Sequence, residues 1–188
     1  MSEKIYLYPV WIRLWHALNA ILIILLIISG VSMQFTNPDN PFIRFDIAVR
    51  MHNISGMILT LNYFFFLAGT IVTPNGKHYK ITLKGLTGRI IKQFTYYTFG
   101  IFKHEPTPFP VTKDSKFNPL QQFTYVAAMF FLVPVVIITG WALLYPELVL
   151  TKFFGGSGLK VNDFIHVIIG FFVSFFMFVH VYFCTIGA

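Results

Sequence analysis

Four histidines lie inside long apolar stretches of this sequence, where an ionisable side chain is costly and usually serves a function. They are His16, His52, His166 and His180. A neutral imidazole is a common ligand of transition metals and of haem iron. These residues therefore predict metal or haem coordination inside a membrane.

The depth of each histidine in its stretch sorts the four into two pairs. His16 lies near the start of the first apolar stretch, and His180 lies near the end of the fourth. His52 and His166 each lie near the start of an even-numbered stretch. If the chain crosses the bilayer four times, His16 and His180 share a level near one face. His52 and His166 then share a level near the other face.

The spacing of the two histidines in the fourth stretch supports this pairing. His166 and His180 are fourteen residues apart. In a helix this is about 21 Å, and fourteen steps of about 100° return nearly to the same face. One helix face would then present two imidazoles, each opposite a histidine of another helix. This layout predicts two b-type haems with bis-histidine ligation, and therefore electron transfer, because six-coordinate iron has no open position.

Other metal chemistry fits the sequence less well. A zinc site needs about four ligands in one place, but the two pairs lie most of a bilayer apart with no carboxylate or thiolate beside them. The single cysteine, Cys184, excludes the CxxCH attachment of c-type haem. The other two histidines, His78 and His104, fall in a basic loop, where we expect surface residues without a special role.

The composition explains why these stretches are expected to cross a membrane. The chain is 56% hydrophobic and only 11% charged, and a soluble domain of this size could not bury so much apolar surface. Four continuous runs each reach about 20 residues, enough to span the hydrocarbon as a helix. We predict an all-α membrane protein with one domain, 1–188, a four-helix bundle with helices at about 11–35, 47–72, 120–145 and 161–188.

The basic residues predict the orientation. Eight of the fourteen Lys and Arg lie between Lys77 and Lys116, and cytoplasmic loops of membrane proteins carry such an excess. Both termini and this loop are therefore expected in the cytoplasm of a bacterium, with the helices in its inner membrane. The net charge of +7 is then a loop bias and predicts contact with membrane lipid but not with nucleic acid. Residues 81–99 are predicted to form an amphipathic helix on the inner surface, with an irregular loop as the alternative.

Aromatic residues near the ends of the runs are typical of interface anchors. We expect this role for Tyr8, Trp11 and Trp15 at the inner face, and for Trp141 and Tyr145 at the outer face.

Small and basic residues near the histidines have two interpretations each. Gly30, Gly56 and Gly170 could make room for a flat macrocycle, or they could serve ordinary helix packing. Arg13 and Arg50 could bond a haem propionate, or their side chains could extend to the membrane interface.

Taken together, these motifs resemble the cytochrome b subunits of the bacterial b561/nickel-hydrogenase group. The resemblance covers all four helices. It rests on the Arg-Leu-Trp-His sequence at 13–16, on His52, on the fourteen-residue His spacing, and on Lys-Phe-Asn-Pro-Leu-Gln at 116–121. The last motif and the long basic loop are most similar to the thiosulfate reductase cytochrome b branch, which is related to the formate dehydrogenase gamma subunit.

The resemblance implies more than the histidines do. It implies a respiratory oxidoreductase subunit that passes electrons between a quinone, such as menaquinone or ubiquinone, and a periplasmic partner. That partner would be a multihaem cytochrome or an iron–sulfur subunit, with or without a molybdenum catalytic subunit. The quinone site would use Asn118 and Gln121 together with His180. For Asn118, a helix N-cap before Pro119 is a competing interpretation.

Two other functions stay open from the sequence. One is a stand-alone b561-type carrier that serves a soluble donor, and the other is a non-redox membrane anchor or transporter with buried histidines.

Overall fold

The computed structural model describes residues 7–37, 39–112, 115–148, 152–153 and 156–185. Four of its helical segments are long and apolar enough to cross a membrane. They are α1 (Val10–Phe35), α2 (Phe45–Val72), the span Pro119–Leu144, and α6 (Gly158–Thr185). The predicted all-α four-helix fold is confirmed, and the predicted bounds of the helices differ from these by three residues or fewer. The predicted last residues of the fourth helix, 186–188, lie outside the described residues.

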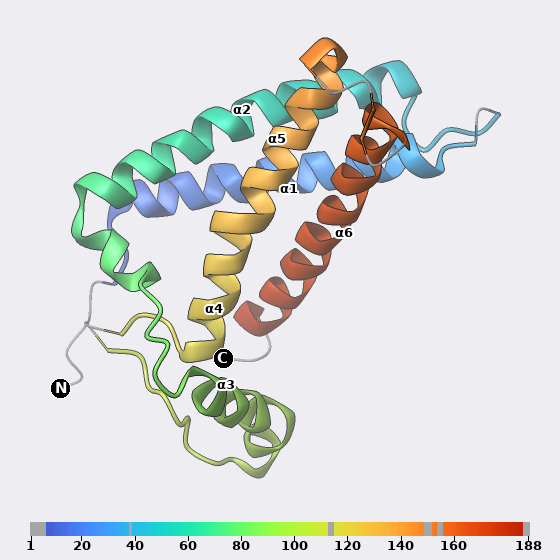
Figure 1. Cartoon of the computed structure of the whole chain (residues 1–188). Helices are drawn as coiled ribbons and strands as arrows, with labels where there is room; N and C mark the ends of the chain where they lie inside the picture. Colours follow the sequence, from blue (N-terminus) through green and yellow to red (C-terminus); the bar gives the residue numbers. More distant parts are fainter. Residues whose placement is uncertain (1–6, 38, 113–114, 149–151, 154–155, 186–188) are drawn as a thin grey trace.

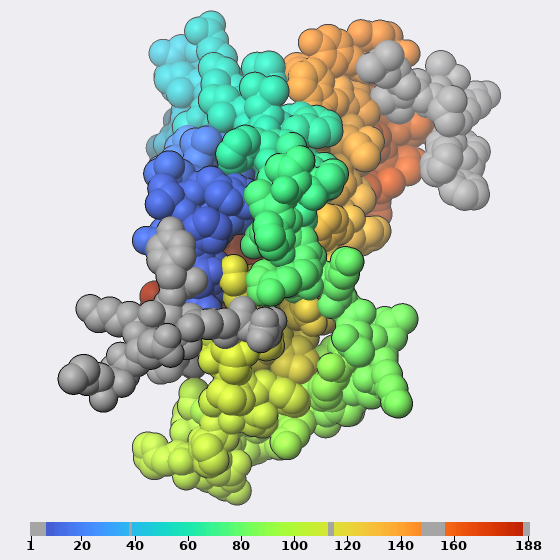
Figure 2. Space-filling model, turned by 90° about the vertical axis from the view of Figure 1, so that its left-hand side faces the viewer, coloured from blue at the N-terminus to red at the C-terminus, as the bar shows by residue number. Residues whose placement is uncertain are grey.

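The helices pack as two antiparallel pairs (Figure 1). α1 and α2 run side by side along most of their length, as the space-filling view also shows (Figure 2). The second pair is α5 and α6. In the described part of the chain, the backbone of α6 packs closely on the third span but not on α1 or α2. The space between α6 and the first pair is therefore bridged by side chains.

The third span is not one regular helix. α4 (Pro119–Ala127) is followed by the π-helical turn η4 (Ala128–Leu132) and then by α5 (Val133–Leu144). Pro134 lies in the first turn of α5, and proline has no N–H to donate to the carbonyl four residues earlier. A π turn is a common way to accommodate such a break in the hydrogen-bond ladder.

The long basic loop folds beneath the ends of α4 and α6 (Figure 1). It contains η1 (Pro74–Tyr79), α3 (Leu86–Thr95), the π turn η2 (Tyr96–Gly100) and the 3₁₀ turn η3 (Ile101–Lys103). The helix predicted at 81–99 thus begins later than expected and continues to residue 103. We call this end of the bundle the loop end; the start of α1 and the end of α6 lie there too.

The opposite end carries a short feature that the sequence did not predict. After η5 (Pro146–Leu148), the two-residue strands β1 (Lys152–Phe153) and β2 (Gly156–Ser157) pair antiparallel just before α6. We call this the hairpin end of the bundle.

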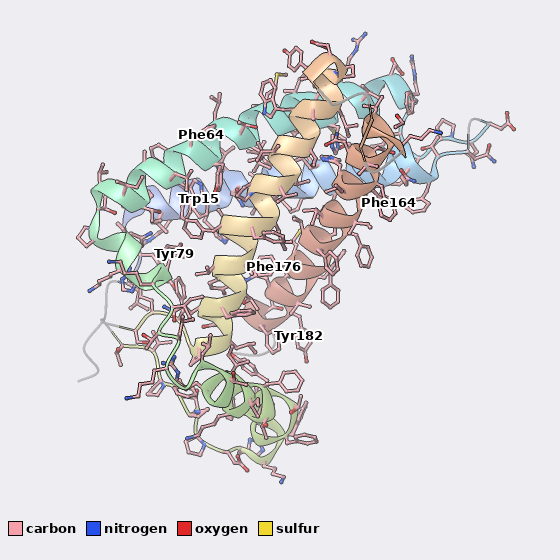
Figure 3. The ribbon with its side chains drawn as sticks, viewed as in Figure 1. Trp15, Phe64, Tyr79, Phe164, Phe176 and Tyr182 are labelled. Atoms are coloured by element: carbon pink, nitrogen blue, oxygen red, sulfur yellow. The ribbon has the colours of Figure 1, made fainter. Side chains whose placement is uncertain are left out.

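Trp15 is a core residue and not an interface anchor, so that prediction was wrong. Its side chain is only 7% exposed. Its Nε1 donates to the Asn62 carbonyl at 3.1 Å, and its ring stacks on Phe66 with centroids 4.4 Å apart. In return, the Asn62 amide donates to the Trp15 carbonyl at 3.4 Å. Figure 3 shows Trp15 between α1 and α2. These two hydrogen bonds join the backbones of α1 and α2, because each side-chain N–H group finds a backbone carbonyl in an otherwise apolar interface.

The prediction that both loop histidines lie on the surface was half wrong. His104 is exposed and ends η3 with a left-handed backbone, φ 55°. His78 is buried, and its carbonyl accepts a hydrogen bond from Gln122 Nε2 at 2.8 Å. η1 folds back onto the start of α4, which removes His78 from the surface.

Candidate functional site

Two histidines of α6 face two different helices. The His180 ring lies opposite His16 of α1, with centroids 6.1 Å apart and planes inclined by 56°. The His166 ring lies opposite His52 of α2, also at 6.1 Å, with planes inclined by 71°. We call the first the loop-end pair and the second the hairpin-end pair. The structure thus brings together the same two pairs that depth predicted from the sequence.

The spacing in both pairs fits a shared iron ion. Metal–imidazole bonds are about 2.0–2.1 Å, so two rings that ligate one metal from opposite sides have centroids roughly 6–6.5 Å apart. The 6.1 Å separations lie in this range. Both pairs also bridge the space between α6 and the pair α1 and α2. Among the described residues, no three His, Cys, Asp or Glu side chains are grouped so that they could hold a metal ion by themselves.

Hydroxyl groups contact both rings of the hairpin-end pair. Ser29 Oγ of α1 lies 3.0 Å from His52 Nδ1. Thr139 Oγ1 of α5 lies 2.9 Å from His166 Nδ1. Contacts of this kind orient a ligand imidazole and select which ring nitrogen is left for the metal.

Glycines lie against the same two rings. A Cβ added to Gly30 would lie 3.4 Å from His52 Cε1, and one added to Gly140 would lie 3.1 Å from His166 Cε1. Of the glycines predicted to make room, Gly30 therefore touches a histidine. A Cβ on Gly56 would only meet Leu26 at 4.0 Å, and one on Gly170 would meet nothing within 4 Å.

The loop-end pair has different neighbours. The phenol oxygen of Tyr125 lies 3.3 Å from His180 Nδ1. The Phe176 ring stacks on the His180 ring with centroids 5.7 Å apart and planes 15° apart, and it points into the bundle in Figure 3. Cys184 Sγ lies 3.7 Å from His180 Nε2, so the expectation that no thiol lies beside the histidine pairs was wrong for this pair. On α1, the ring of Trp15 lies 6.3 Å from that of His16. The surroundings of this pair are mainly aromatic.

Asn118 and Gln121 form a capping box at the start of α4. Asn118 Oδ1 accepts from the Gln121 backbone N–H at 2.9 Å, and Gln121 Oε1 accepts from the Asn118 N–H at 3.2 Å. Asn118 Nδ2 also donates to the Tyr97 hydroxyl at 2.8 Å. The helix-cap interpretation of Asn118 is therefore present in the structure. Tyr125, which contacts His180, lies seven residues further along, about 10 Å up the span.

Arg13 and Arg50 are exposed side chains. Arg13 Nε donates to the Tyr8 carbonyl at 2.9 Å. This contact holds the guanidinium near the loop end, as expected for an arginine that reaches the membrane interface. Its role toward a haem propionate stays a prediction.

Aromatic side chains close the loop end between α2 and the third span. Tyr79 packs against Phe66, Phe117 and Phe130, with ring centroids 5.5 to 5.9 Å apart. Burial raises the pKa of Tyr79 to about 12, so it stays neutral at physiological pH. Figure 3 shows Tyr79 at the turn after α2. The group adds an apolar barrier between the basic loop and the histidines.

Sequence reasoning missed four residues of this site: Ser29, Tyr125, Thr139 and Gly140. Three of them carry a signal that is visible in hindsight. Ser29 precedes Gly30, and Thr139 precedes Gly140, so a hydroxyl–glycine pair recurs at the depth of one histidine pair. A third such pair, Ser55–Gly56, occurs in the second span, so the pattern alone does not identify the residues that meet a ring. Nothing in the spacing distinguished Tyr125 from the other aromatic residues.

Comparisons with known proteins cover nearly the whole chain. The family described as prokaryotic cytochrome b561 matches residues 7–188. The predicted cytochrome YdhU of Escherichia coli (strain K12) is 40% identical over 186 residues, which is 99% of this chain and 70% of that protein. No solved structure matches.

Proposed function

The chain belongs to the prokaryotic cytochrome b561 family, whose members are membrane electron carriers that bind haem b, and on this premise we propose that it is a dihaem cytochrome. One haem would be held by His16 and His180, and the other by His52 and His166. The observation that carries the proposal is the pairing on α6: each of its two histidines faces a histidine of a different helix at the same 6.1 Å.

The residues of the chain have separate tasks in this proposal. The four imidazoles would hold one haem at each level, and the apolar helices would exclude water. When bound, each haem supplies a one-electron redox centre without an open coordination position. Because α6 carries a ligand for both levels, it fixes their separation at about 21 Å along its axis.

The orientation and the quinone site belong to the proposal as well. The excess of Lys and Arg in residues 74–118 supports a cytoplasmic loop end in a bacterial inner membrane. A quinone, menaquinone or ubiquinone, would then react near the loop-end pair. Asn118, Gln121 and His180 lie at that end, and amide and imidazole groups can hydrogen-bond quinone carbonyls.

We further propose that the chain is a subunit of a respiratory oxidoreductase. A periplasmic multihaem cytochrome or iron–sulfur subunit, with or without a molybdenum catalytic subunit, would exchange electrons at the hairpin end. A stand-alone carrier is the alternative, and co-purification of other subunits in mild detergent distinguishes the two. Family membership argues against the third possibility, a non-redox anchor.

Absorption spectra and haem content of the purified chain test the central proposal. The dithionite-reduced protein should show the α band of b haem, with two haems per chain. His16→Ala and His180→Ala should each remove one haem, and His52→Ala and His166→Ala should each remove the other. His104→Asn is the matched control, because Asn tolerates the left-handed backbone at that position.

The outcomes separate the levels of the proposal. A chain without a b-type spectrum contradicts any cytochrome role. If His16→Ala and His52→Ala removed the same haem, the two-level pairing would be wrong, although the chain would still be a cytochrome.

A further inference from the structure

The two rings of the hairpin-end pair are held in the same way by two unrelated helices. Ser29 and Gly30 of α1 contact His52 of α2. Thr139 and Gly140 of α5 contact His166 of α6. In each case the hydroxyl meets Nδ1 and the next residue, a glycine, meets Cε1 of the same ring. We call Ser29–Gly30 and Thr139–Gly140 the two hydroxyl–glycine clamps.

The hydrogen bonds of each hydroxyl determine which nitrogen of the histidine carries the proton. A hydroxyl has one proton to donate. Ser29 Oγ lies 2.6 Å from the Leu25 carbonyl, and Thr139 Oγ1 lies 2.7 Å from the Val135 carbonyl. A carbonyl can only accept, so each hydroxyl proton goes to its own helix. The hydroxyl oxygen is then available to accept from Nδ1–H, which leaves the Nε2 lone pair for a metal. Each ring also has a backbone hydrogen bond, to Leu26 for His52 and to Val136 for His166.

The glycine lets the ring lie against the helix backbone. A side chain at Gly140 would begin 3.1 Å from His166 Cε1, and one at Gly30 would begin 3.4 Å from His52 Cε1. The distance at Gly140 is tighter than normal van der Waals contact, so a methyl group there would press on the ring, whereas one at Gly30 would only reach ordinary contact. The ring is therefore held on two sides, by a hydrogen bond at Nδ1 and by backbone at Cε1.

The loop-end pair has no such clamp. His180 Nδ1 meets the phenol of Tyr125 at 3.3 Å, and within the described residues that phenol has no helix carbonyl to take its proton. It can therefore donate or accept. For His16, no hydrogen bond to the ring occurs among the residues that the structure describes. The two levels thus differ in how firmly their ligands are fixed.

We propose that the two clamps are positioning elements that set the protonation pattern, ring orientation and redox potential of the centre at the hairpin end. This inference rests on the proposed dihaem function. A hydrogen bond from Nδ1–H to an acceptor makes the imidazole more basic, and a more basic ligand favours the oxidised metal. The clamps therefore lower the midpoint potential of this haem and leave the loop-end haem unchanged.

Redox titration of single variants tests the proposal. Ser29→Ala and Thr139→Val remove one acceptor each and should raise the midpoint potential of the same haem, with two haems retained. The double variant should raise it further. Ser29→Thr and Thr139→Ser keep the hydroxyl, so the midpoint potential of the hairpin-end haem should stay at its wild-type value. Ser174→Ala is the control, because the Ser174 hydroxyl bonds to the Gly170 carbonyl at 2.8 Å without contact to a histidine among the described residues.

Electron paramagnetic resonance of the oxidised protein gives a second readout, because the low-spin signal depends on the angle between the ligand planes. Gly140→Ala should change the signal of the hairpin-end haem only, and Gly30→Ala, whose methyl group reaches ordinary contact with the ring, should change the same signal less. These variants keep both hydroxyls, so they test ring position separately from the hydrogen bond.

Each outcome bears on the clamps alone. A raised midpoint potential of the hairpin-end haem in Ser29→Ala and Thr139→Val supports them when the loop-end haem is unchanged, since that haem then reports an intact fold. Unchanged potentials, equal shifts in both haems, or loss of both haems would overturn the proposal. A wild-type protein without two haems would instead contradict the proposed function.

Discussion

Asn118 at the loop end has a structural role in the fold and a second role in the proposed function. The Asn118 oxygen caps α4, and its amide nitrogen donates to Tyr97. The same amide is the group proposed to meet a quinone. The two atoms have different partners, so substitutions can separate the structural function from the electron-transfer function.

Asn118→Ser and Asn118→Asp keep an oxygen that can accept from the Gln121 N–H, but they lose the amide donor. We expect near-normal thermal stability and slower quinone-dependent oxidation or reduction of the haems. Asn118→Ala loses the cap as well and should cost about 1 kcal/mol of stability. Melting curves and stopped-flow quinone kinetics measure the two effects. Unchanged quinone kinetics in the Ser and Asp variants would mean that Asn118 is a cap and nothing more.

The histidine positions were predictable from the sequence because an ionisable residue in an apolar run is conspicuous, and depth depends only on counting. Their hydrogen-bond partners were not. Ser29 and Thr139 can contact a ring only if their helices are rotated to face it, and rotation depends on packing between helices. A serine that bonds its own helix carbonyl looks the same in sequence whether or not a histidine lies opposite.

At the scale of elements, α1 and α2 approach each other very closely at one point of the loop end. The Trp11 ring lies on the backbone of α2 at Gly69, where an added Cβ would lie 2.7 Å from two ring carbons, Cζ3 and Cη2. Trp15 adds the reciprocal hydrogen bonds with Asn62 one turn further along α1. This packing places His16 at the level of the end of α6.

Gly69→Ala should therefore destabilise the protein by about 1–3 kcal/mol, because the Trp11 ring must move in a packed interface. Alanine is the better helix former by about 1 kcal/mol, which offsets part of the loss. Gly88→Ala in α3 is the matched control: nothing lies within 4 Å of its added Cβ, so the same substitution should be neutral or stabilising. Thermal unfolding monitored by helical circular dichroism measures both.

A second substitution tests the cause. Trp11→Phe removes the ring carbons that the new methyl group would meet, so it should recover part of the stability of Gly69→Ala. Equal stability of the Gly69→Ala and Gly88→Ala proteins would show that Trp11 moves without cost.

The length of each helix followed from hydropathy, since about 20 apolar residues are needed to cross the hydrocarbon. The details within the helices did not. The π turn at Ala128–Leu132 lies just before Pro134, and a hydropathy window registers neither feature. Trp15 was misplaced because a tryptophan near a helix end is typical of an interface, whereas its partner Asn62 is 47 residues away in the chain.

At the scale of the whole molecule, one helix carries a histidine of each of the two pairs, and therefore a proposed ligand for each of the two levels. Because α6 crosses the membrane with His166 and His180 about 21 Å apart, an electron that moves between the levels crosses most of about 30 Å of hydrocarbon. Electron transfer between the levels should therefore depend on the membrane potential.

Moving one charge across the whole membrane is worth about 2.3 kcal/mol at 100 mV. About 21 Å of about 30 Å is roughly 0.7 of the crossing, so electron transfer between the levels is worth roughly 1.6 kcal/mol at 100 mV. That corresponds to about a tenfold change in the ratio of the reduced haems. With the loop-end side negative, the electron should move toward the hairpin-end haem. Spectra of partly reduced membrane vesicles of one orientation, recorded with and without a potassium diffusion potential, measure the redistribution.

The His16→Ala protein is the control, since a chain with only the hairpin-end haem has no second level and should show no redistribution. A two-haem protein that did not respond to the membrane potential would have both haems at one depth. That result would contradict the pairing on α6. A response of opposite sign would keep the two levels and reverse the proposed orientation, because the loop end would then face the periplasm. One measurement thus tests the separation of the levels and the direction of the chain independently.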